Sequence, residues 1–152
     1  MSVPSNKVLI PVHIELYMEA FGTNAQFECQ AVSGTGGSRT SGGTAITPVN
    51  MRTDLSNNSG LTAYAGGNSI VTVGQTGNLN VFWRDGQQFA VTKTTASATS
   101  SVTDPNKFVW DAVATNTFVL CGGGSGAQLQ VNQGSQAGTG FVKLVAVVLD
   151  AT

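Results

Sequence analysis

His13 and Glu15 are the two residues of this sequence whose types and spacing best suit acid–base chemistry. His13 is the single histidine of the chain, and Glu15 follows two positions later in a segment that reads K-V-L-I-P-V-H-I-E-L-Y-M-E-A. Residues two apart in a β-strand point to the same face, so this imidazole and this carboxylate lie within reach of each other. No third group in the sequence stands out as a nucleophile or as an orienting partner. We therefore interpret the pair as surface or interface residues, and a hydrolase is the third class of function that we consider.

The other chemically active residue types form no recognisable ligand set. The acidic residues are scattered without metal-ligand spacing, and the glycine runs at 34–37 and 122–126 lack the lysine and the helix of a phosphate-binding loop. Cys29 and Cys121 are too few for a disulfide framework. Two buried thiols are the preferred interpretation, and one disulfide is the alternative. We predict no catalytic residues, no metal and no cofactor.

The composition favours a soluble protein with much of its surface facing other protein. Only 10% of the residues are charged, against about 25% in ordinary globular domains. The net charge of −1, without a run of either sign, argues against nucleic acid as a partner. No window approaches the roughly 20 apolar residues of a membrane span, and the N-terminal M-S-V-P-S-N-K does not read as a signal peptide. At 152 residues, we expect a single domain, 1–152, made in a cytoplasm.

Residues 7–20 are predicted to be the strand that positions the His13–Glu15 pair. Its alternate residues are apolar, and this face is predicted to lie in the core: Val8, Ile10, Val12, Ile14, Leu16 and Met18. The opposite face, which holds His13 and Glu15, lies in or near water. Pro11 has no amide hydrogen to donate, so it marks the start of the paired region, a bulge or an edge.

Residues 140–150 form a second strong strand, G-F-V-K-L-V-A-V-V-L-D, which is apolar on both faces. One face carries Phe141, Val145, Val147 and Leu149, and the other carries Val142, Leu144 and Val148. One face of a strand in an all-β protein normally meets water, so this strand needs a cover on its second face. That cover is either a second layer of the same chain or another copy of it.

Shorter strands are predicted between these two. We expect them at 26–32, within 61–73, and at 108–113, 117–121 and 128–133. In the first of them, Phe27, Cys29 and Ala31 share one side. Asp85-Gly86 predicts a two-residue hairpin that places Phe82 opposite Phe89.

The segments between the strands are rich in glycine, serine and threonine. Residues 44–54 are predicted to be extended but irregular, and 92–103 are either a surface strand or a long loop. We expect flexible loops near 33–43 and 122–126, the first being either a solvated connector or a loop that orders on a partner. The whole pattern predicts an all-β fold, an antiparallel β-sandwich of jelly-roll type with long Gly/Ser-rich loops.

The segment 43–51, G-T-A-I-T-P-V-N-M, resembles a stretch of small structural proteins from the heads of tailed bacteriophages, in which T-P-V-N follows a glycine-rich loop. The later order of Trp110-Asp111, a strand, a glycine-rich loop, L-Q-V and a closing apolar strand is similar to the same group. The nine-residue motif has modest specificity, and T-P-V-N as an ordinary turn is the alternative.

The resemblance implies a jelly-roll decoration or cement protein that binds the outside of an assembled capsid, commonly as a homotrimer. The implied partner is the major capsid protein of the same virion, and the implied location is the virion surface after synthesis in the host cytoplasm. It carries over no catalytic residue. The residues that we take as possible partner contacts lie in or beside the motif: Arg39, Thr47, Pro48, Val49 and Asn50.

A carbohydrate- or receptor-binding module, such as a fibre tip or lectin, is the alternative function. Tyr64, Trp83 or Trp110 would supply the stacking surface for a sugar, with Tyr17 as a further aromatic residue. Such residues are also typical core or interface anchors. Jelly rolls serve both purposes, so the predicted fold does not separate the two functions.

Overall fold

The computed structural model describes residues 1–21, 26–56, 60–66, 72–75, 77–88, 107–122, 127–133 and 138–151. The regular elements of these residues are all strands, and their pairings are antiparallel. The predicted all-β, antiparallel fold is thereby confirmed. None of the described residues belongs to a helix with the length and apolarity to cross a bilayer.

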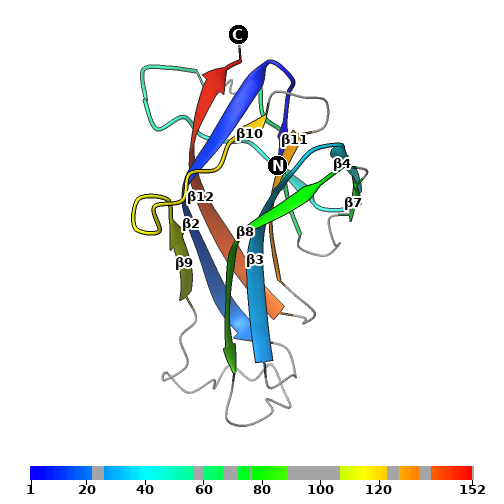
Figure 1. Ribbon diagram of the computed structural model, residues 1–152, viewed down its shortest axis with the longest axis vertical. Coiled ribbons are helices and arrows are strands. Elements are labelled where there is room, and N and C mark those ends of the chain that lie inside the picture. Colours follow the sequence, from blue (N-terminus) through cyan, green and yellow to red (C-terminus); the bar gives the residue numbers. More distant parts are fainter. Residues whose placement is uncertain are drawn as a thin grey trace.

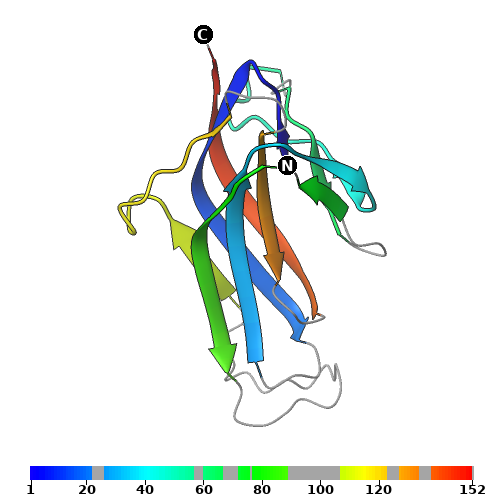
Figure 2. The same cartoon turned by 45° about the vertical axis from the view of Figure 1, so that its right-hand side comes forward.

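Two main sheets make up the body of the molecule (Figure 1). The first has the order β1 (Ser2–Val3), β11 (Ala127–Gln133), β3 (Gln26–Gly34), β8 (Leu79–Gln88). In the second, β2 (Lys7–Phe21) pairs with β12 (Gly138–Asp150) along one side and with β9 (Lys107–Asp111) and β10 (Cys121–Gly122) along the other. Figures 1 and 2 show β3 and β8 in front of β2 and β12, so the two sheets face each other.

Two small sheets lie beside this body. β4 (Gly37–Ser41) pairs with β7 (Thr72–Gln75), and β5 (Thr44–Ile46) pairs with β6 (Ala63–Ala65). Along the chain, β4 and β5 lie between β3 of the first main sheet and the segment that contains T-P-V-N.

The core lies between the two main sheets. Its larger cluster takes members from β2, β9, β3 and β8: Ile14, Leu16, Met18, Phe27, Cys29, Ala31, Trp83, Phe108, Trp110 and Ala112. A second cluster contains Val3, Leu9, Val119, Cys121 and Leu129. Both tryptophans are therefore core residues, as the anchor interpretation predicts. Trp110 is only 1% exposed, so its ring is not available as a sugar-stacking surface.

A bulge in β2 determines which of its residues face the core. Val145 of β12 pairs with His13 and Ala146 pairs with Pro11, which leaves Val12 as an extra residue in this ladder. One extra residue exchanges the two faces of a strand beyond it. Pro11 therefore marks a bulge, which is one of the three positions predicted for it.

The prediction of one uninterrupted core face along β2 is wrong because of this bulge. Before the bulge, Leu9 and Pro11 are buried while Val8 and Ile10 are only half-buried; after it, Ile14 is buried. After the bulge the predicted faces hold, so the face opposite the core carries His13, Glu15 and Tyr17.

Strands 26–32, 128–133 and 140–150 are confirmed as β3, β11 and β12. Phe27, Cys29 and Ala31 share the buried side of β3 as predicted. Cys29 and Cys121 are free buried thiols, so the preferred thiol interpretation is confirmed over the disulfide.

The predicted hairpin at Asp85-Gly86 is wrong. β8 runs straight through both residues, which pair with Cys29 and Glu28 of β3. A Cβ at Gly86 would lie 2.6 Å from the carbonyl oxygen of Phe27, so glycine here permits a close approach of two strands instead of a turn. The proposed partner of Phe82, Phe89, lies outside the described residues.

The loop predicted at 33–43 differs in the structure. β3 continues to Gly34, and Gly37–Ser41 form β4 against β7. Polar residues can form the strand pair of β4 and β7 because the hydrogen bonds between strands are made by the backbone. Residues 123–126 of the second expected loop, like 92–103, lie outside the described residues.

The remaining predictions are met in part. Residues 44–54 contain the short strand β5 and are otherwise irregular, as expected. The strand expected at 108–113 ends at Asp111, and the strand expected at 117–121 is limited to Cys121–Gly122. A turn occupies 112–116 because Thr115 donates its amide to the carbonyl of Asp111, 3.0 Å away.

Candidate functional site

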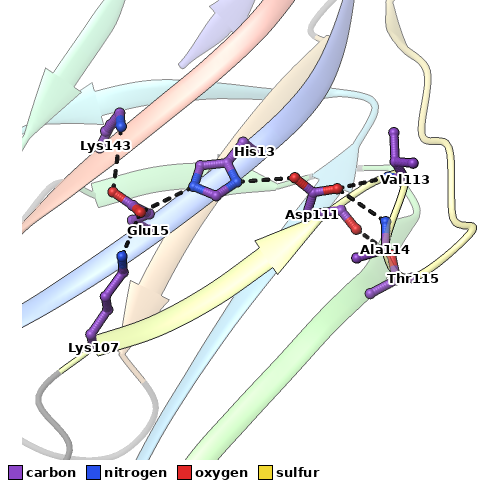
Figure 3. A network of polar contacts seen from close by, with 8 residues as sticks. All are labelled: His13, Glu15, Lys107, Asp111, Val113, Ala114, Thr115 and Lys143. Carbon is purple, nitrogen blue, oxygen red and sulfur yellow. Dashed lines mark hydrogen bonds and ion pairs between the residues drawn. The ribbon is translucent and has the colours of Figure 1, made fainter.

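The outer face of the β9–β2–β12 sheet, opposite the core, holds a network of charged side chains from all three strands (Figure 3). His13 is its centre. Nε2 of His13 lies 3.2 Å from Oε1 of Glu15, and Nδ1 lies 3.2 Å from Oδ2 of Asp111. The predicted proximity of His13 and Glu15 is confirmed, and Asp111 is an additional partner from β9.

Glu15 connects His13 to two lysines. Lys107 Nζ from β9 lies 2.7 Å from Oε1 of Glu15, and Lys143 Nζ from β12 lies 3.5 Å from Oε2. The hydrogen bonds from Lys107 and His13 hold the pKa of Glu15 at about 2, well below its ordinary value. Glu15 therefore remains a carboxylate at every physiological pH.

Asp111 is fixed by its own turn. Its Oδ1 accepts hydrogen bonds from the amides of Val113 at 2.9 Å and Ala114 at 3.0 Å. These backbone bonds, followed by the bond to His13, lower the pKa of Asp111. The carboxylate is thus positioned before it meets the imidazole.

This geometry suits cohesion between strands better than catalysis. A general base needs one free ring nitrogen for its substrate, but each nitrogen of His13 already faces a carboxylate. No group of three metal-ligating side chains converges anywhere in the described part of the chain. The network therefore connects β9, β2 and β12 through their side chains. His13 with Asp111 and Glu15 with Lys143 are also partners in the backbone ladders, whereas Lys107 reaches Glu15 diagonally.

An apolar stripe continues the outer face beyond the charged network. The rings of Tyr17 and Phe141 stack with centroids 4.9 Å apart and an interplanar angle of 17°. Toward the other end of β12, Val147 and Leu149 are 46% and 50% exposed. The outer face of β12 is therefore not covered by the described residues of its own chain.

The five predicted partner-contact residues lie away from this network. Arg39 belongs to β4, where its guanidinium lies over the ring of Tyr64, 4.1 Å from the centroid, and its Nε donates to the carbonyl of Gly42 at 2.6 Å. The other four follow β5 in the irregular segment: Thr47, Pro48, Val49 and Asn50. In Figures 1 and 2 this segment lies at the end of the molecule that carries the C-terminus.

Four large apolar side chains are exposed between Ile46, the last residue of β5, and Leu55. Ile46 is 49% exposed, Val49 77%, Met51 82% and Leu55 49%. Polar contacts hold the turn of this segment: Asn50 Oδ1 accepts the amide of Arg52 at 3.0 Å, and Arg52 pairs with Asp54 at 2.6 Å. Val49 is among the predicted partner contacts, whereas Met51 and Leu55 are not, although both are apolar residues in a polar stretch of sequence.

Comparison of the chain with protein-family models, with curated proteins and with solved structures found no match.

Proposed function

We propose that this chain is a non-enzymatic virion structural protein that binds the outside of a phage capsid as a decoration or cement protein. The observation that carries this proposal is the exposed apolar segment 46–55, which contains T-P-V-N. The partner is the major capsid protein of the same virion, and the location is the capsid surface. The proposal agrees with the resemblance of residues 43–51.

The segment 46–55 has the character of a binding surface. Val49 and Met51 are exposed by more than three-quarters of their surface, and exposed apolar patches are typical of interaction sites. The hydrogen bonds of Asn50 and the exposed Arg52–Asp54 pair surround them with polar groups, as at the rim of an interface. Because these bonds already fix the turn, less conformational entropy is lost when a partner binds.

The fold supports the same function. Two antiparallel sheets around a common core favour a single β-sandwich domain, and we propose the jelly-roll connectivity for it. The His13 network adds side-chain bonds across three strands, which suits a protein that stabilises a shell.

Co-sedimentation with undecorated shells of the major capsid protein tests the proposal. The double variant Val49→Asp with Met51→Asp is expected to lose binding, because two carboxylates would be buried without partners. Val113→Asp is the matched control, since Val113 is 72% exposed but lies on another loop, and it should bind as the natural chain does. Failure of the natural chain to sediment with shells at any concentration would contradict the proposal.

The alternative, a carbohydrate- or receptor-binding module, has less support. Trp83 and Trp110 lie in the core, and Arg39 covers one face of Tyr64. Binding of the natural chain to a glycan array, abolished by Tyr64→Ala, would favour this alternative over capsid decoration.

A further inference from the structure

We infer that the free edge of β12 docks on β12 of a second copy of this chain, in an antiparallel pairing about a two-fold axis at Val145. Among the described residues, β12 pairs with β2 alone and ends the sheet. It is 13 residues long, and Lys143 is its single charge before Asp150. Natural proteins shorten, charge or cover such edges because the edges otherwise pair with another chain. This inference does not depend on capsid binding.

The backbone of β12 has hydrogen-bonding groups directed to that edge. The amide of Ala151 donates to the carbonyl of Asn6, 2.9 Å away, next to the pair Asp150–Lys7, so Ala151 points toward β2. Successive residues of a strand direct their amides and carbonyls to opposite sides. Alternate residues of β12 therefore direct theirs away from β2, among them Val142, Leu144, Ala146 and Val148. An extended strand is the occupant that pairs all of these groups at once.

The extra residues of the bulges belong to β2, so the alternation along β12 itself is continuous. Val145 and Ala146 are consecutive in β12 but pair with His13 and Pro11. The edge of β12 is thus regular, while the irregularity lies on the side already paired. A regular edge without proline or bulge lacks the usual protection against pairing.

The sequence of β12 is complementary to itself when reversed. Residues opposite each other in an antiparallel pair share a face. With Val145 on the axis, Phe141 meets Leu149 of the partner subunit and Val142 meets Val148 of the partner subunit. Phe141 and Leu149 are 54% and 50% exposed in the single chain, so this register covers two of the most exposed side chains of the strand.

Other registers fit less well. Moving the axis by one residue, to Ala146, sets Asp150 opposite an apolar residue, Val142. The axis at Val145 sets Asp150 opposite Gly140 instead, where no side chain is buried against it. Lys143 then lies opposite Val147 of the partner subunit, and its ammonium remains directed to Glu15, 3.5 Å away in its own chain.

A two-fold pairing of this kind gives a dimer, since both subunits use the same edge. It differs from the trimer that the resemblance to decoration proteins implies. The two paired sheets would form one continuous sheet across the axis. The charged network of each subunit would then border the apolar centre of the interface.

Light scattering of the full chain at several concentrations tests the inference. The expected mass is twice the chain mass of 15.6 kDa. Val145→Lys places two ammonium groups opposite each other at the axis, so we expect a roughly hundredfold weaker dimer. Val145→Glu should behave in the same way, and an equimolar mixture of the two variants should restore the dimer mass. Leu120→Lys, a substitution of a side chain that is 70% exposed and lies outside the charged network, should leave the dimer intact.

Amide hydrogen exchange of the natural chain gives a readout that needs no variant. In the dimer, the amides of Val142, Leu144, Ala146 and Val148 should be protected, and dilution should remove that protection. The amides of Val147 and Leu149, which point to β2, should remain protected throughout. A monomer at all concentrations, a trimer, or a dimer that survives Val145→Lys would overturn the inference.

Discussion

Nδ1 of His13 and Oδ2 of Asp111 lie 3.2 Å apart, and this contact joins β2 to β9 at the place where β9 ends. His13 and Asp111 are also direct partners in the backbone ladder of these strands. The side-chain contact therefore reinforces a pairing between residues that are 98 positions apart in the sequence.

Acid should weaken the fold through the carboxylate of Glu15. Its pKa in the folded chain is about 2 against 4.5 for the unperturbed group, so the carboxylate adds stability above pH 4.5. This contribution is lost as the pH falls from about 4.5 toward about 2. We expect the free energy of unfolding, measured with urea at a series of pH values, to decline over this window. Asp111, whose pKa is also lowered, acts in the same direction.

Glu15→Gln should make that decline shallower, because the amide does not titrate. Glu19→Gln removes a carboxylate from an exposed position of the same strand and serves as the control. An equal decline in the natural chain and in Glu15→Gln would show that the network does not contribute to acid stability.

Ile14→Ala and Ile10→Ala test the bulge because they make the same substitution in β2 on its two sides. Without the bulge both isoleucines would share a face, but Ile14 is fully buried and Ile10 only half-buried. We expect Ile14→Ala to lower the free energy of unfolding by about 2–5 kcal/mol and Ile10→Ala by clearly less. Chemical denaturation measures both values, and equal losses would contradict the exchange of faces.

Gly140→Ala should destabilise the pairing of β12 with β2. A Cβ at this position would overlap the carbonyl oxygen of Tyr17 and lie 3.0 Å from the Cα of Met18, so the backbone of one strand must move. We expect a loss of about 1–3 kcal/mol in thermal or chemical unfolding. Gly66→Ala is the control, since no atom lies within 4 Å of the added Cβ, and a similar loss there would contradict the steric explanation.

Both thiols should be inert in the folded chain. Burial raises the pKa of Cys29 to about 12 and that of Cys121 to about 11, and the thiolate is the reactive form. At pH 8 we expect no reaction with Ellman's reagent until guanidinium unfolds the chain, when two thiols per chain should react. Absence of reaction after unfolding would indicate a disulfide.

The long strands were predictable because alternation of apolar and polar residues is a local property. It placed 7–20, 128–133 and 140–150 correctly, along with the proximity of His13 and Glu15. The bulge at Val12 was not predictable, since the register of β2 against β12 depends on a strand from the other end of the chain. The composition of β2 alternates through the bulge without a break, and only Pro11 marks its place.

The errors at Asp85-Gly86 and at 33–43 have a common cause. Glycine tolerates both a turn and the close approach of two strands, and the local sequence does not tell which one the partner strand requires. Asp111, Lys107 and Lys143 were missed as neighbours of the His13–Glu15 pair for a similar reason. They come together through cross-strand register, which joins residues about a hundred positions apart.

The pairing of β2 with β12 also determines when this protein can fold. The ion pair of Lys7 with Asp150 closes a separation of 143 residues, and β9 and β10, which pair with the other side of β2, follow late in the chain as well. A nascent chain therefore carries β2 without any of its sheet neighbours until β9, β10 and β12 have been synthesised. We expect folding to be slow, since long-range contacts delay folding. During that interval we expect the exposed apolar residues of β2 to bind chaperones.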